Sequence, residues 1–229
     1  GGAAEAYGIK IAALLPQEVA FSVDSISVTA SGGAGGDINI TVHDAVKLVA
    51  AGGNADAYGI FNNKGSLVAS VTGDITAEAT GGAAGGMAPG KKGKGGSYSG
   101  GTGGDGIAGR NGSTLIGSTA VAVGSYNEAG RSAIQAGDIT ATVTGGIGSK
   151  DADGGEGGTG GYGGGVGGNG AVGGNGGTGG TGIAAGVQNI NGISLITAAK
   201  LSANATGGAG GTGGAGGAGG KGGESMYGG

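Results

Sequence analysis

The chain has 229 residues with a formal net charge of −4, and 69 of them are Gly, whereas Cys and Trp are absent. Glycine makes up about 7% of ordinary proteins, and its backbone entropy disfavours helices. With 3% aromatic and 11% charged residues, a compact core of large side chains is excluded. The scattered basic residues argue against nucleic-acid binding. No apolar run approaches the roughly 20 residues that cross a bilayer, so we expect no membrane insertion.

Internal repeats begin at the first residue. The phrase GGAAEAYGI at 1–9 returns as GGNADAYGI at 52–60, and GGDGI at 103–107 and GGTGI at 179–183 are shortened copies. Each copy is followed by a tight turn rich in Asn and Gly, residues that suit such turns. The predicted turns are NKGSL at 63–67, NGSTL at 111–115 and NGISL at 191–195.

A second repeated phrase predicts strands. GDITAEATGG at 73–82 and GDITATVTGG at 137–146 are near copies, and 25–33 and 200–208 are looser ones. Apolar residues alternate with polar ones, which is typical of strands buried on one face. In the first copy the apolar set is Ile75, Ala77 and Ala79, and the polar set is Thr76, Glu78 and Thr80.

Strands of this kind become stable when successive copies stack and share one core. We therefore predict an all-β fold, a parallel β-helix, with an antiparallel β-sandwich as the alternative. The chain forms one elongated domain over 1–229, with β-segments at about 4–80, 107–144 and 183–206. The first of these includes a bend at His43 and Asp44.

Three glycine-rich tracts, 81–106, 145–182 and 207–229, interrupt the strands. The last consists of GGX triplets, and in a helix of three residues per turn every third residue lies along one edge. Collagen is excluded because Pro16 and Pro89 are the only prolines. We expect polyglycine II-type helices that hydrogen-bond side by side, and a flexible linker is the alternative.

The segment AYGIFNNKGSLVASVTGDITAEATGG at 57–82 resembles the repeats of autotransporter and filamentous-haemagglutinin-type bacterial adhesins. The tracts, above all GGNGGTGGTG at 173–182, resemble the polyglycine II regions of bacterial surface proteins. The resemblance implies a right-handed parallel β-helix at the cell surface or outside the cell, and a role in adhesion or in building a matrix.

No catalytic constellation is evident, and we expect no enzyme and no cofactor. The single histidine, His43, stands beside Asp44, but neighbouring strand residues point to opposite faces, and a corner of the chain accounts for both. One histidine without cysteine cannot form a zinc site.

Calcium is the open alternative among ligands. Asp105 lies in GGTGGDGIA, which fits the nonapeptide of calcium-binding toxin repeats, and Asp37 lies in a partial copy. Asp151, Asp153 and Glu156 offer three carboxylates in one short stretch. The nonapeptide binds in tandem arrays whereas these copies are isolated, so we assign no metal ligand.

The predicted function is that of a structural subunit of an extracellular filament or matrix that binds further copies of itself head to tail. The phrases GGAAEAYGI at the start and GGESMYGG at the end favour this, because one could continue the other. The alternative is an adhesin or receptor-binding tip whose loops, such as 87–99, bind a glycan or host surface. Tyr7, Tyr58 and Tyr227 are expected to stack as a ladder.

Overall fold

A computed structural model describes residues 1–12, 18–35, 51–86, 91–96, 101–105, 116–150, 153, 156–161 and 165–223. These residues form twelve β-strands and no helix. The strands are β1 (Ala4–Ile11), β2 (Val19–Val23), β3 (Ile26–Ser31), β4 (Ala55–Asn63), β5 (Ser66–Val71), β6 (Ile75–Thr80), β7 (Ala120–Glu128), β8 (Arg131–Gln135), β9 (Asp138–Thr144), β10 (Gly182–Ile190), β11 (Ile193–Thr197) and β12 (Lys200–Thr206).

The strands form three four-stranded sheets, which we name A (β1-β4-β7-β10), B (β2-β5-β8-β11) and C (β3-β6-β9-β12). Three consecutive strands, one for each sheet, make a rung, so rung 1 is β1–β3 and rung 4 is β10–β12. Every strand pair is parallel. The arrangement is consistent with a parallel β-helix, and the alternative of an antiparallel β-sandwich was wrong. Parallel pairing places the equivalent residues of near copies side by side, as for Ile75 and Ile139.

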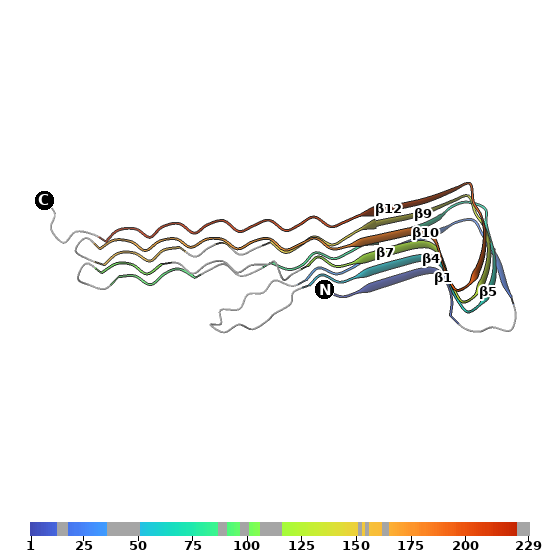
Figure 1. Ribbon diagram of the computed structural model, residues 1–229, viewed down its shortest axis with the longest axis horizontal. Helices are drawn as coiled ribbons and strands as arrows, with labels where there is room; N and C mark the ends of the chain where they lie inside the picture. The colour runs from blue at the N-terminus through green and yellow to red at the C-terminus, as the bar shows by residue number, and fades with distance from the viewer. Residues whose placement is uncertain are drawn as a thin grey trace.

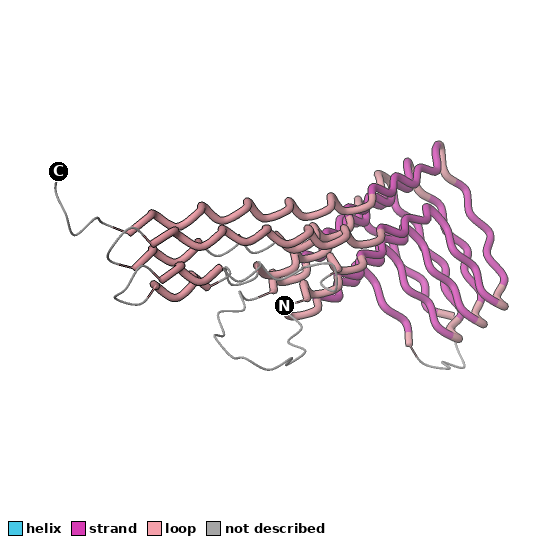
Figure 2. Tube along the Cα trace, turned by 60° about the vertical axis from the view of Figure 1, so that its left-hand side comes forward, coloured by secondary structure: helices cyan, strands magenta, loops and turns pink. Residues whose placement is uncertain are grey.

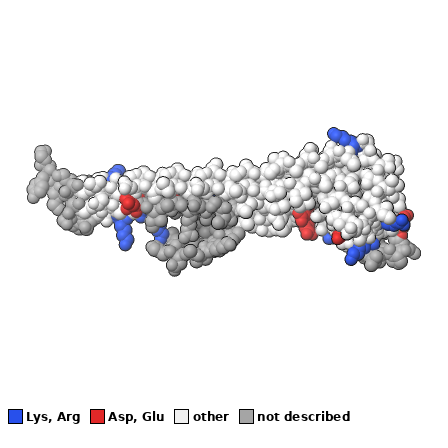
Figure 3. All heavy atoms as spheres, viewed as in Figure 1, with Lys and Arg blue, Asp and Glu red and all other residues white. Residues whose placement is uncertain are grey.

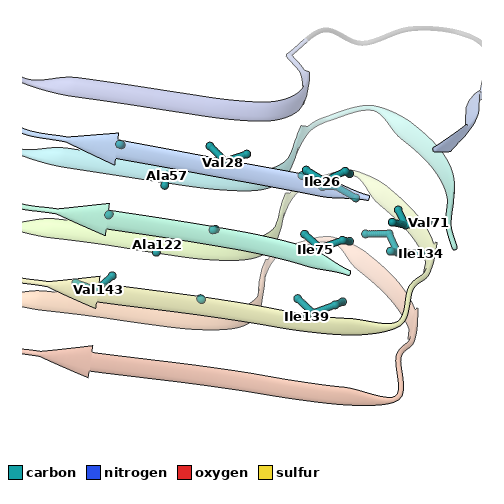
Figure 4. Close-up of a cluster of buried hydrophobic side chains, with 14 of the residues drawn as sticks. Ile26, Val28, Ala57, Val71, Ile75, Ala122, Ile134, Ile139 and Val143 are labelled. Carbon is teal, nitrogen blue, oxygen red and sulfur yellow. The ribbon is translucent and has the colours of Figure 1, made fainter. Parts of the chain in front are cut away.

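Sheets A and C face each other, and sheet B closes one end of the pair (Figure 1). The core between them is thin. Ile26, Ile75 and Ile139 stand in one column of sheet C (Figure 4). They face glycines of sheet A, and a Cβ added to Gly59 would collide with the Ile75 Cγ2. Glycine in this column therefore lets the two sheets approach closely.

The corner from sheet A to sheet B repeats the pattern Asn-x-x-Gly. Its third residue has a left-handed backbone, with φ of 65° at Lys64, 51° at Ala129 and 53° at Asn191. The predicted turns at 63–67 and 191–195 lie at this corner, but the intervening rung uses Ala129-Gly130, which the sequence analysis missed. The predicted turn at 111–115 lies outside the described residues.

The asparagines that begin these corners form a ladder inside the fold. Asn62 and Asn127 are 0% exposed, and the Asn62 Nδ2 donates to the Asn127 Oδ1 over 3.0 Å. The Asn127 Nδ2 donates in turn to the Asn189 Oδ1 at 2.8 Å. The first rung places Ile11 in this position. The ladder therefore satisfies the buried amides and holds three successive corners in register.

The strand of the third rung begins at Ala120, not directly after GGDGI. Gly103 and Gly104 instead lie among the glycine segments, where the Gly103 N–H donates to Val166 and the Gly104 N–H to Lys94. That part of the repeat prediction was therefore wrong. The bend predicted at His43 and Asp44 lies outside the residues that the structure describes.

Glycine segments leave sheet C and return to sheet A as extended chains that run side by side far beyond the strands (Figure 2). One chain of hydrogen bonds crosses them in order of rung. Each residue in this chain donates its N–H to the C=O of the next one. The order is Gly208, Gly180, Gly146, Ser118, Gly82, Gly53, Gly33 and Gly2. The glycine segments that leave sheet C thus bond to the segments that enter sheet A, the sheet that faces sheet C.

The contacts between segments recur at every third residue. Along 207–223 the N–H groups of Gly208, Gly211, Gly214, Gly217, Gly220 and Gly223 donate to the segment 165–180, and the acceptors are Gly180, Gly177, Gly174, Ala171, Gly168 and Gly165. The third residues of the triplets, such as Thr212 and Lys221, are exposed. This is the period expected for a helix of three residues per turn.

Candidate assembly edge

Rung 4 leaves the core open on one side. Leu201 occupies the same inward-facing column as Ile139 and Ile75, yet it is 55% exposed whereas both isoleucines are 0% exposed. Ala203 and Ala205, which continue the inward face of β12, are exposed as well. Strands β10, β11 and β12 are the edge strands of their sheets. This side, which we call the rung 4 edge, is the unpaired strand edge that proteins otherwise cover.

The outer surface of the same rung is also unusually apolar. Ile193 and Leu195 point outward from β11 and are 60% and 68% exposed, and the residues beside them on β8 are Arg131 and Ala133. On the face that Figure 3 shows, the described charged side chains gather toward the two ends and leave an uncharged stretch between them. Few charges therefore oppose contact along the rung 4 edge.

The glycine segments give this edge a polarity. Gly208 donates its N–H to the glycine segment that enters rung 4, while its carbonyl accepts no hydrogen bond from the described residues, and the same holds for Gly211 and Gly214. At the opposite edge, Gly2 accepts from Gly33, and its own N–H has no partner in the described part of the chain. One edge therefore presents carbonyl acceptors in this chain of bonds, and the other presents a donor.

An aromatic cluster lies on the outer face of sheet A. The rings of Tyr7 and Tyr58 stack at 5.3 Å with an interplanar angle of 11°. Phe61 and Tyr126 stack at 4.8 Å and 6°, and the Lys10 Nζ lies 3.8 Å from the centre of the Tyr7 ring. The predicted ladder is confirmed for Tyr7 and Tyr58, whereas Tyr227 lies outside the described residues.

The sequence analysis missed Phe61 and Tyr126. The signal was present: Phe61 directly precedes the ladder residue Asn62, and Tyr126 directly precedes Asn127. In both rungs an aromatic residue therefore lies one position before the asparagine, on the opposite face of the strand.

Burial and nearby carboxylates raise the pKa values of groups in and beside this cluster. Burial, followed by the charge of Asp56, raises the pKa of Tyr58 to about 12. Burial, followed by Glu5, raises the pKa of Asp56. The Tyr7 hydroxyl donates to the Glu5 Oε2 over 3.0 Å. Each stacked pair joins two neighbouring strands of sheet A, so the cluster is suited to fixing adjacent rungs.

The carboxylates considered as calcium ligands that the structure describes each make a separate contact. The Asp105 Oδ1 accepts the Asn169 N–H at 2.7 Å, and the Asp153 Oδ1 accepts the Ala215 N–H at 2.9 Å. Glu156 pairs with Lys92 at 3.3 Å. Asp37 and Asp151 lie outside the described residues. Within the described ranges no group of three or more potential metal ligands occurs. The two aspartates instead accept hydrogen bonds from backbone amides of neighbouring glycine segments.

The remaining predictions concern residues that the structure covers in part. His43 and Asp44 are outside the described residues, so the prediction that they carry no catalysis stays a prediction. Of the loop 87–99, the structure describes 91–96, where Lys91, Lys92 and Lys94 are exposed. No helix capable of crossing a bilayer occurs among the residues described.

Comparison with known proteins gives no matching family model, no matching curated protein and no matching solved structure.

Proposed function

We propose that this chain is a structural subunit of an extracellular or cell-surface filament, built as a parallel β-helix whose rungs extend into a bundle of polyglycine II-type helices. The period of three in the inter-segment hydrogen bonds supports the glycine helices. The parallel stacking of rungs supports the solenoid. The extracellular location rests on the likeness of the repeats to bacterial surface adhesins.

The observation that carries self-assembly is the open core at the rung 4 edge. A fully buried Leu gains about 1.5–3 kcal/mol over an exposed one. Leu201 is 55% exposed, so covering it contributes roughly 1 kcal/mol. The strand edges add backbone hydrogen bonds along β10, β11 and β12. An uncovered edge of this kind favours association through the edge over a free monomer.

The test is assembly of the purified 229-residue chain, followed by light scattering and negative-stain microscopy. We expect elongated polymers. Leu201→Glu should abolish them, because it places a charge in the interface. The matched control is Ile147→Glu: Ile147 is 54% exposed, close to Leu201, but lies in a glycine segment that leaves rung 3. A monomeric wild-type chain, or equal loss of polymer in both variants, would refute the proposal.

A further inference from the structure

We infer that the partner at the rung 4 edge is the rung 1 edge of a second copy, joined in parallel and in register, so that β1, β2 and β3 of one molecule continue β10, β11 and β12 of another. This inference rests on the proposed self-assembly and adds its direction and its register. The competing arrangement is a tail-to-tail pair, in which two rung 4 edges meet and growth stops at a dimer.

Direction follows from the polarity of the hydrogen bonds between glycine segments. In the chain from Gly208 down to Gly2, each segment donates to the segment below it. A tail-to-tail pair would bring the free carbonyl of Gly208 toward its own counterpart, acceptor against acceptor. A head-to-tail pair instead offers it the N–H of Gly2 from the second copy, which repeats the bond already made at each step.

A second set of bonds agrees with this direction. Segments leaving sheet C donate upward: the N–H of Gly32 donates to Thr80, that of Gly81 to Thr144 and that of Gly145 to Thr206. Continuing the series, the N–H of Gly207 would donate to the carbonyl of Ser31 in the second copy. Gly207 donates to no acceptor among the described residues.

Register follows from the columns of side chains. The column Ser31, Thr80, Thr144 and Thr206 runs across sheet C on its outer face. Continued by one step, it places Ser31 of the second copy beside Thr206. The inward column then places Ile26 over Leu201, so that a branched side chain covers the exposed leucine. At the junction Ile11 meets Asn189, and the asparagine ladder is interrupted there.

Engineered cysteines test the register, since the chain has none of its own. Adjacent in-register strands lie about 4.8 Å apart, within the Cα separation of about 4.4–6.8 Å that a disulfide requires. The double variant Ser31→Cys with Thr206→Cys should therefore form a ladder of disulfide-linked oligomers on oxidation. The control Thr29→Cys with Thr206→Cys is displaced by two residues, about 6.6 Å along the strand, and should lose that ladder.

The outcomes separate the two proposals. Polymers in reducing buffer without a Ser31–Thr206 ladder on oxidation would overturn the register and leave self-assembly standing. Disulfide dimers of Thr206→Cys alone would overturn the direction in favour of the tail-to-tail pair. Absence of polymers from both the wild type and the reduced cysteine variants would overturn the proposed function itself.

Discussion

Two glycines of the last tract, Gly211 and Gly213, separate the steric role of glycine from its conformational role. Neither has a left-handed φ. A Cβ on Gly211 would overlap the carbonyl of Ser149, whereas a Cβ on Gly213 would meet no atom nearer than the Gly174 O at 3.5 Å, an ordinary contact. Gly211→Ala and Gly213→Ala therefore change composition identically but differ in the space available.

Gly211→Ala must push its segment away from the neighbouring ones. The bonds at risk run from Gly211 to Gly177 and from Gly177 to Ser149, at 2.7 and 3.0 Å. At about 0.5–1.5 kcal/mol each, their loss costs roughly 1–3 kcal/mol. Gly213→Ala should instead stabilise the segment by about 0.4–1 kcal/mol, because alanine restricts the unfolded chain.

Amide hydrogen exchange of the glycines in 207–223 measures the difference, because it reports local opening of each segment. We expect faster exchange at Gly208 and Gly214 in Gly211→Ala, and unchanged or slower exchange at both in Gly213→Ala. Similar exchange in the two variants would refute the reasoning, since a flexible linker would not distinguish the two positions.

Three further predictions concern the rungs. Asn127→Ala should lower the free energy of unfolding in urea by roughly 2–3 kcal/mol. Asn189→Ala should lower it by less, because Asn189 lies at the exposed end of the ladder. Equal losses in the two variants would contradict the ladder. Ala129→Gly should raise stability by about 0.5–1 kcal/mol because φ is 51°, whereas Ala133→Gly in a strand should lower it. Burial raises the pKa of Tyr58 from 10.0 to about 12, so its contribution to stability is complete below pH 10.0 and declines as the pH rises through about 12. In Tyr58→Phe, the free energy of unfolding measured as a function of pH should no longer show that decline.

The strands of sheet C were predictable because their sequences are near copies with strict alternation. The phrase GDIT spans the start of both β6 and β9, and the inward residues Ile75 and Ile139 occupy the same position in each. The aligned columns require parallel stacking, which the sequence favoured but could not impose, since alternation suits a hairpin equally well.

The sheet A strand of the third rung was not predicted from the repeated phrases of the sequence. This strand is AVAVGSYNE, which shares with ADAYGIFNN only the small inward residues, an aromatic residue and the asparagine of the corner. Small residues suit those positions, because Ala120 and Ala122 are fully buried and a Cβ on the neighbouring Gly124 would collide with Ile139. The surrounding glycines gave false copies such as GGDGI. The spacing Asn-x-x-Gly marks all three corners of this type and was the better signal.

The continuity between strands and glycine segments explains how such a thin core can be stable. The bond from Gly145 to Thr206 joins the end of β12 to the segment that leaves β9, so the strand ladder passes into the glycine ladder without a change of neighbour. Each glycine segment is then ordered by backbone bonds on more than one side, which offsets the high entropy cost of fixing glycine. In 207–223 a Cβ is excluded at every third residue, such as Gly208 and Gly211, whereas Lys221 occupies an exposed position of a triplet. The same continuity directs growth, because a segment added above rung 4 would find strand edges and glycine carbonyls aligned along one side of the molecule.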